Sequence, residues 1–168
     1  MCRKPLKQAK TKERTMNLKQ LTLATVTAAL IVPATYAAAP TSKLDDALKA
    51  GSEYGFTHYH EIEFDDNQEF EIKGQLKDNW IADVEYADDG RILHEQRERH
   101  ADNATGLTQS QIREAAKAAQ EKGMVRIEEI DLRGNDRLKI EGEDDSGREL
   151  EITFQLADMA VLKVDHDD

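Results

Sequence analysis

The sequence predicts an α+β fold of two tandem repeats, each consisting of one helix packed on a small antiparallel β-meander. Three observations lead to this prediction. The first 37 residues have the pattern of an export leader. The remainder matches itself at an offset of 68 positions, and each matched half starts with a helical pattern that gives way to alternating strand patterns.

The leader lies at residues 16–37, upstream of all the predicted elements. It has a lysine near its start, an uncharged apolar run from Leu21 to Val32, and small side chains up to Ala37, after which we expect cleavage. This three-part pattern is typical of a secretory signal peptide. A membrane anchor is the alternative, but the run is shorter than the roughly 20 apolar residues that span a bilayer. We therefore expect a periplasmic protein.

Residues 1–15 form a basic, polar extension upstream of this leader, so either Met1 or Met16 is the true start. The only cysteine of the chain, Cys2, lies in this extension. It is not placed for lipid attachment, because it precedes the apolar run. The predicted mature protein therefore has no cysteine and depends on core packing for its stability.

The internal repeat, which matches at this offset without gaps, divides the predicted mature chain into a first repeat at residues 42–97 and a second at residues 108–168, and residues 98–107 form a polar linker between them. Identical residues coincide: Ala47 with Ala115, Lys49 with Lys117, Gly55 with Gly123, Ile62 with Ile130, Ile72 with Ile140 and Gly74 with Gly142. Apolar positions also coincide: Leu44 with Ile112, Phe64 with Leu132, Phe70 with Leu138, Val84 with Ile152 and Tyr86 with Phe154. Such self-similarity is typical of a repeated structural unit.

Each repeat begins with a helix, predicted at residues 42–54 and 108–122 from apolar residues spaced three and four apart. Ser42 and Thr108 are suitable N-caps, and Thr108 forms a capping box with Gln111. A glycine directly after each helix suits the left-handed conformation in which helices often end.

Alternating apolar and polar residues then predict four strands in each repeat, with turn residues between them. The predicted strands are residues 57–64, 69–74, 80–86 and 91–97 in the first repeat, and 125–132, 137–142, 148–155 and 160–165 in the second. The short gaps permit hairpins, so we expect antiparallel meanders. The residues expected to face the helices are Phe70, Ile72, Trp80, Ala82, Val84, Tyr86, Leu138, Ile140, Leu150, Ile152 and Phe154.

The pattern leaves open whether the two repeats pack as separate units or share one continuous sheet. A unit of about 60 residues is marginal on its own, which favours contact between them.

Charge narrows the classes of partner. The chain has 23 basic and 34 acidic residues. The predicted leader and its extension hold seven of the basic residues and one of the acidic residues. The predicted mature protein therefore has a net charge of about −17. Nucleic acids and anionic membranes need a basic patch, and neither is expected as a partner. A basic protein or peptide, or a metal ion, suits the negative net charge of the predicted mature protein better.

The second repeat resembles a PepSY domain, through the stretches REAAKAAQEKG, VRIEEIDL, RLKIEGEDDSGRELEITF and AVLKVDHDD between Ile112 and the C-terminus. The first repeat is similar through DDALKAGSEYG, HEIEF, FEIKG and WIADVEYADDGRIL. The resemblance implies an exported, non-catalytic module that binds or modulates a protein or peptide, such as a peptidase. The sequence departs from the family pattern at Leu156–Asp158, where a glycine is expected before the last strand.

No catalytic constellation is apparent in the sequence, and no cofactor is predicted. The mature serines lie near helix starts and a turn, and none follows the G-x-S-x-G pattern of a nucleophile elbow. The alternative to a protein-binding function is a metal site. His58 and His60 would point to the same face of a strand, about 7 Å apart. His94, His100 and the tail from Asp165 to Asp168 could add further ligands.

Overall fold

The computed structural model describes residues 39–168, except 66, 101, 102, 104, 167 and 168. The predicted leader, its upstream extension and the cleavage position after Ala37 lie outside the described residues. The described residues belong to a compact unit that spans Tyr36–Asp168. None of the described helices has both the length and the apolar character needed to span a membrane.

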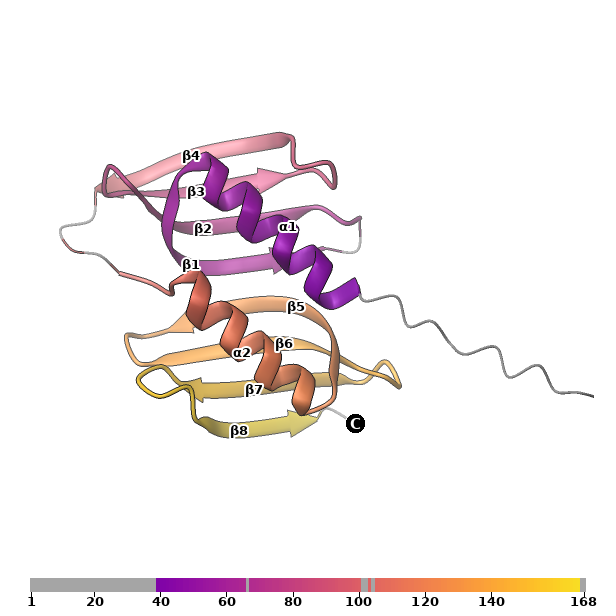
Figure 1. Cartoon of the computed structure of the whole chain (residues 1–168). Helices are drawn as coiled ribbons and strands as arrows, with labels where there is room; N and C mark the ends of the chain where they lie inside the picture. The colour runs from indigo at the N-terminus through magenta and orange to yellow at the C-terminus, as the bar shows by residue number, and fades with distance from the viewer. Residues whose placement is uncertain (1–38, 66, 101–102, 104, 167–168) are drawn as a thin grey trace, which may run out of the picture. The chain divides into compact units, whose positions relative to one another are not determined.

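Two helices and eight strands make up this unit (Figure 1), each within a few residues of the range predicted for it. Their bounds are α1 Ala39–Tyr54, β1 Phe56–Phe64, β2 Phe70–Leu76, β3 Trp80–Tyr86, β4 Ile92–His100, α2 Gln109–Glu121, β5 Met124–Arg133, β6 Arg137–Asp144, β7 Glu149–Gln155 and β8 Val161–His166.

The strands form one antiparallel sheet in the order β4-β3-β2-β1-β5-β6-β7-β8. The predicted fold class, two tandem repeats that each have a helix on a small meander of their own, is therefore wrong. The structure is a single eight-stranded sheet with two helices, and strands dominate it. Both helices lie on the same face of the sheet, α1 over β1–β3 and α2 over β5–β7 (Figure 1). The opposite face is here called the open face.

The sheet is continuous because β1 and β5 pair with each other. Ile62 lies opposite Ile130, and Glu63 opposite Glu129. Closer to its N-terminal end, β1 pairs with the linker instead: the amide of Tyr59 donates to the carbonyl of Leu107 at 2.9 Å, and the reverse bond is 2.7 Å. These bonds satisfy backbone groups that would remain unpaired if the meanders were separate.

One hydrophobic core runs through the whole unit. The two helices contribute Leu44, Ala47, Leu48, Ile112, Ala115, Ala116 and Ala119, and the strands contribute Tyr59, Ile62, Ile72, Val84, Tyr86, Ile130, Ile140, Ile152 and Phe154, among others. Of the strand residues predicted to face the helices, Trp80 differs, because it is 37% exposed at the start of β3. The shared core explains why the halves do not form separate domains: each covers apolar surface of the other.

The helix ends follow local sequence only in part. Thr108 caps α2 and forms the predicted capping box with Gln111. The predicted N-cap Ser42 is wrong, because α1 begins earlier and Ser42 lies inside it. Gly55 and Gly123 follow the helices with φ of 122° and 102°, conformations that favour glycine, as predicted.

Candidate functional site

A hollow of about 640 Å³ lies between α1 and the turn that joins β3 to β4. We call it the α1–β4 hollow. Its apolar lining comes from Ala50, Tyr54, Phe70, Tyr86 and Ile92, and its polar lining from Asp46, Lys49, Glu53, Asp88, Asp89 and Gly90. Phe70 and Tyr86 are buried core residues, whereas Ile92 is 40% exposed. The hollow therefore has a fixed aromatic floor and a solvated rim.

Tyr86, one of the residues that line the floor, carries an unusual polar group, a buried hydroxyl. The ring stacks on Phe70 with centroids 4.8 Å apart and planes 12° apart, and the residue is 2% exposed. Its hydroxyl oxygen has no hydrogen-bond partner in the described part of the chain. Burial, together with the nearby Tyr54, Tyr59 and Glu95, raises the pKa of this phenol, so the hydroxyl stays protonated and can both donate and accept.

Other buried polar side chains of the same half have partners. The hydroxyl of Tyr59 donates to the carbonyl of Leu48 at 3.4 Å and accepts from Nε2 of Gln109 at 2.9 Å. Gln75, which is 1% exposed, accepts at Oε1 from the amide of Thr105 at 2.8 Å. Since leaving a buried polar group unpaired costs roughly 1–3 kcal/mol, the Tyr86 hydroxyl stands out.

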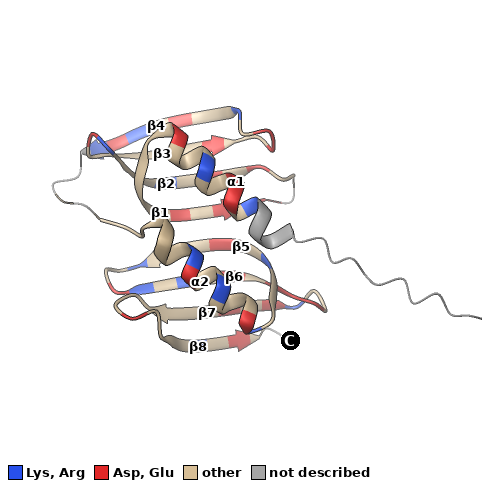
Figure 2. Ribbon diagram, viewed as in Figure 1, with Lys and Arg blue, Asp and Glu red and all other residues tan. Residues whose placement is uncertain are grey.

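The rim of the hollow is acidic. Asp46 and Glu53 on α1 and Asp88 and Asp89 in the β3–β4 turn provide four carboxylates against the single ammonium of Lys49. Figure 2 shows acidic residues in red both along α1 and at the turn between β3 and β4. At one end, Tyr54 donates to Oε2 of Glu95 on β4 at 3.1 Å, which connects the helix to the edge strand. The rim therefore favours a cationic group.

The strand beside the hollow, β4, is an edge of the sheet. It pairs with β3 on one side, and no described strand pairs with its other side. Every residue of β4 whose burial is described is exposed. An edge strand has unpaired backbone groups that can pair with an added chain.

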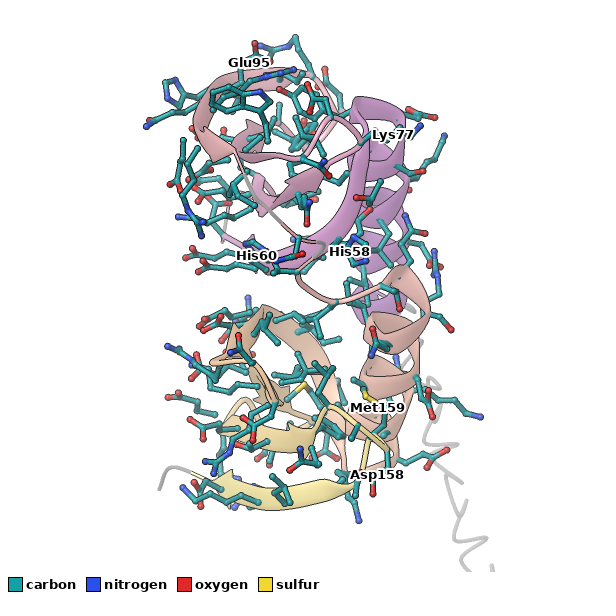
Figure 3. The ribbon with its side chains drawn as sticks, turned by 90° about the vertical axis from the view of Figure 1, so that its left-hand side faces the viewer. His58, His60, Lys77, Glu95, Asp158 and Met159 are labelled. Carbon is teal, nitrogen blue, oxygen red and sulfur yellow. The ribbon has the colours of Figure 1, made fainter. Side chains whose placement is uncertain are left out.

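The two histidines predicted as metal ligands, His58 and His60, lie on β1 (Figure 3) beside the linker that follows β4. Nε2 of His60 is 3.1 Å from both the carbonyl and the hydroxyl oxygen of Thr105, and Nδ1 of His58 is 3.2 Å from Oγ1 of Thr57. Burial lowers the pKa of His60, partly offset by its hydrogen bond to Thr105. In this structure His60 acts as a support for the linker.

Two of the additional ligands suggested for that metal site, His94 and His166, lie far from it, whereas Asp167 and Asp168 lie outside the described residues. His94 lies on β4, three strands away from β1, and His166 lies on β8 at the opposite edge of the sheet. Strands are spaced about 4.8 Å apart, so neither reaches β1. The described residues contain no cluster of three or more His, Cys, Asp or Glu that could hold a metal. Metal binding at His58 and His60 stays a prediction.

The open face of the sheet carries crowded carboxylates. Burial and the nearby Asp83, Glu63 and Glu61 raise the pKa of Glu71 on β2 to about 7. On β5, burial and the hydrogen bond with Glu141 raise the pKa of Glu129 to about 7. Lys139 is 3.6 Å from Glu129 and contacts Glu141. This face is therefore sensitive to pH near neutrality.

Sequence reasoning did not find the α1–β4 hollow. Tyr86 fits the apolar alternation of β3, so its pattern predicts a core residue and gives no indication of an unpaired hydroxyl. The one available signal is the difference between the two turns. The second half has Leu156 and Met159 at the positions where the first half, 68 residues earlier, has Asp88 and Arg91.

Comparison with known proteins gives no family. No protein-family model matches the chain, and no curated protein matches it. Among solved structures, a crystal structure of a protein provisionally assigned as a lipoprotein from Clostridium difficile 630 is similar, with 18% identity and a TM-score of 0.41. The alignment covers 76% of this chain and 93% of that one. A TM-score this low does not establish a shared fold, and the PepSY resemblance stays a prediction.

Proposed function

We propose that this protein is a non-catalytic binding protein that takes up an extended segment of a peptide or protein along the edge strand β4. The single observation behind the proposal is that an unpaired sheet edge runs beside a preformed hollow. Ile92, the first residue of β4, belongs to both. An added strand would pair with the edge through its backbone, and one of its side chains would enter the hollow.

The chemistry of the surface supports a binding function. Strand addition needs accessible backbone groups, and residues 92–99 of β4 are all exposed. The acidic rim and the high negative charge favour a basic segment and speed its approach. The hydroxyl of Ser146 donates to Oδ1 of Asp144 at 2.6 Å inside a turn, an arrangement that stabilises the turn and does not activate a nucleophile.

The setting we propose is the cell envelope. The leader pattern at residues 16–37 supports export to the periplasm. The PepSY resemblance supports a partner that the module modulates, such as a peptidase. Both proposals rest on the sequence.

Selection from a random dodecapeptide library displayed on phage, with the purified protein as bait, tests this function. Selected peptides should protect amides of β4 from hydrogen exchange and leave those of β8 unchanged. Peptides with N-methyl groups on alternate backbone amides should bind at least about tenfold more weakly, since each methyl removes a donor needed for strand pairing. Protection confined to β8, or no selectable peptide, would rule the proposal out.

A further inference from the structure

We propose that the α1–β4 hollow is a recognition pocket for a long cationic side chain, lysine or arginine, of the bound peptide. The inference rests on the proposed function, and it names the chemistry of the partner. Three observations support it. They are the side chains that occupy the corresponding position beside the β7–β8 turn, the buried hydroxyl of Tyr86, and the negative charge of the rim.

In the second half of the sheet, apolar side chains occupy the position that corresponds to the hollow, beside the turn that joins β7 to β8. Phe154 lies opposite Leu138 on β6 in the same way that Tyr86 lies opposite Phe70 on β2. The turn after Phe154 places Leu156 and Met159 against the core. Figure 3 shows Met159 and Asp158 in that turn beside α2. In the second half the protein therefore covers this end of its core with long apolar side chains of its own.

The first half lacks such a filling. Its turn is closed tightly, with the amide of Ala87 donating to the carbonyl of Arg91 at 2.9 Å and that of Gly90 to Ala87 at 2.9 Å. The turn residues Asp88 and Arg91 are exposed, and Arg91 makes an ion pair with Asp89. The space that Leu156 and Met159 occupy in the second half is therefore open to a side chain from another molecule.

The Tyr86 hydroxyl indicates that the incoming side chain is polar at its end. The corresponding residue, Phe154, is fully buried without a hydroxyl, so the packing does not require an oxygen at this position. A buried hydroxyl without a partner destabilises the fold unless a ligand supplies one. An ammonium or guanidinium group can donate to this oxygen.

The remaining lining fits the rest of such a side chain. The methylene stem of lysine or arginine would pack on Ala50, Phe70 and Ile92, as these stems do on apolar surfaces. The four rim carboxylates would compensate the positive charge near the mouth. A neutral apolar side chain would fill the space but leave the hydroxyl unpaired, and an acidic one would be repelled by the rim.

The test is an NMR titration of the purified protein with three probes: N-acetyl-lysine amide, N-acetyl-arginine amide and N-acetyl-norleucine amide. Norleucine has the stem of lysine without its charge. At least one cationic probe should shift resonances in α1 and in residues 86–92, and should bind at least about fivefold more tightly than norleucine. Equal affinity for norleucine, or shifts confined to other regions, would overturn the proposal.

Three variants sharpen the test. Tyr86→Phe keeps the ring and should weaken binding of the cationic probe by roughly three- to tenfold. Asp89→Asn should weaken it as well. Asp158→Asn is the matched control for Asp89, because Oδ1 of each aspartate accepts from the amide two residues later, at 3.0 and 3.1 Å. It should leave binding unchanged. Full affinity in Tyr86→Phe, or equal losses in the two aspartate variants, would contradict the proposed pocket.

The outcome separates this inference from the proposed function. If selected peptides protect β4 but bind Tyr86→Phe as tightly as the unchanged protein, strand addition stands and the pocket fails. If the cationic probe binds at the hollow while no peptide protects β4, the pocket stands and strand addition fails.

Discussion

Ile62 of β1 lies directly opposite Ile130 of β5, and both side chains are fully buried. This pair joins the two four-stranded halves into one sheet. The two residues are also 68 positions apart, the offset at which the sequence matches itself. The junction therefore brings corresponding strands together antiparallel at corresponding residues.

The continuity of the sheet can be tested by a disulfide across the junction. In a Cys2→Ser background, the double variant Glu63→Cys/Glu129→Cys should form a disulfide readily, because the two positions are direct cross-strand partners. Glu63→Cys/Glu141→Cys is the control, since Glu141 lies one strand further away, opposite Glu129. At about 10 Å its Cα is beyond disulfide range. Similar yields for the two variants in a thiol assay would argue against a β1–β5 pair.

The unpaired hydroxyl of Tyr86 predicts an unusual effect on stability. Tyr86→Phe should leave the free energy of unfolding unchanged or raise it by up to about 1 kcal/mol, because it removes a buried polar group that has no partner. Tyr59→Phe is the matched control. It removes the hydrogen bond with Gln109 and should cost about 1 kcal/mol. Urea denaturation of both variants measures the difference. A loss in Tyr86→Phe as large as that in Tyr59→Phe would show that the Tyr86 hydroxyl has an internal partner.

The two turns that follow β3 and β7 predict unequal responses to truncation. Met159→Ala should lower the free energy of unfolding by about 1–2 kcal/mol, since Met159 packs against the core. Arg91→Ala, at the corresponding position in the first half, should stay within about 0.5 kcal/mol, because Arg91 is exposed. Thermal or urea unfolding would compare them. Equal losses would mean that the first turn also fills its hollow.

The carboxylates of the open face predict how stability depends on pH. Folding raises the pKa of Glu71 and of Glu129 from 4.5 to about 7, so the folded state binds more protons than the unfolded state between these values. Their contribution to stability is greatest below pH 4.5 and is lost as the pH rises toward 7.

Glu71→Gln and Glu129→Gln should therefore each stabilise the protein at pH 8, by about 0.5–1 kcal/mol after allowance for solvent screening, and reduce its loss of stability between pH 5 and pH 8. Glu121→Gln is the control, since Glu121 is exposed at the end of α2, on the other face of the sheet. Urea midpoints at several pH values test this, and a glutamine variant with an unchanged pH profile would contradict it.

Sequence patterns predicted the helices and strands closely because each has a strong local signal. Thr108 and Gln111 determine the start of α2, and alternation determines strands such as β3 and β7. The continuous sheet could not be predicted in this way. Side-chain alternation in β1 shows which face is buried, but the backbone groups that pair with β5 have no signature in the sequence. That is the reason why the predicted fold class was wrong.

The sequence pattern did not predict the α1–β4 hollow for a related reason. Tyr86 and Phe154 fit the same apolar pattern, and only the surroundings of the Tyr86 hydroxyl distinguish them. The spacing of His58 and His60 predicted a metal site. In the structure, His60 forms a hydrogen bond with Thr105 of the linker. The different turns, Asp88–Arg91 and Leu156–Met159, were visible in the sequence, but their consequence depends on how each packs beside its helix.

The most direct test of the central claim is the measurement of intermolecular nuclear Overhauser effects between N-acetyl-lysine amide and the protein. We predict contacts from the lysine methylene protons to the rings of Phe70 and Tyr86, and their loss or weakening in Tyr86→Phe. Contacts to other surfaces, with none to these two rings, would contradict the account.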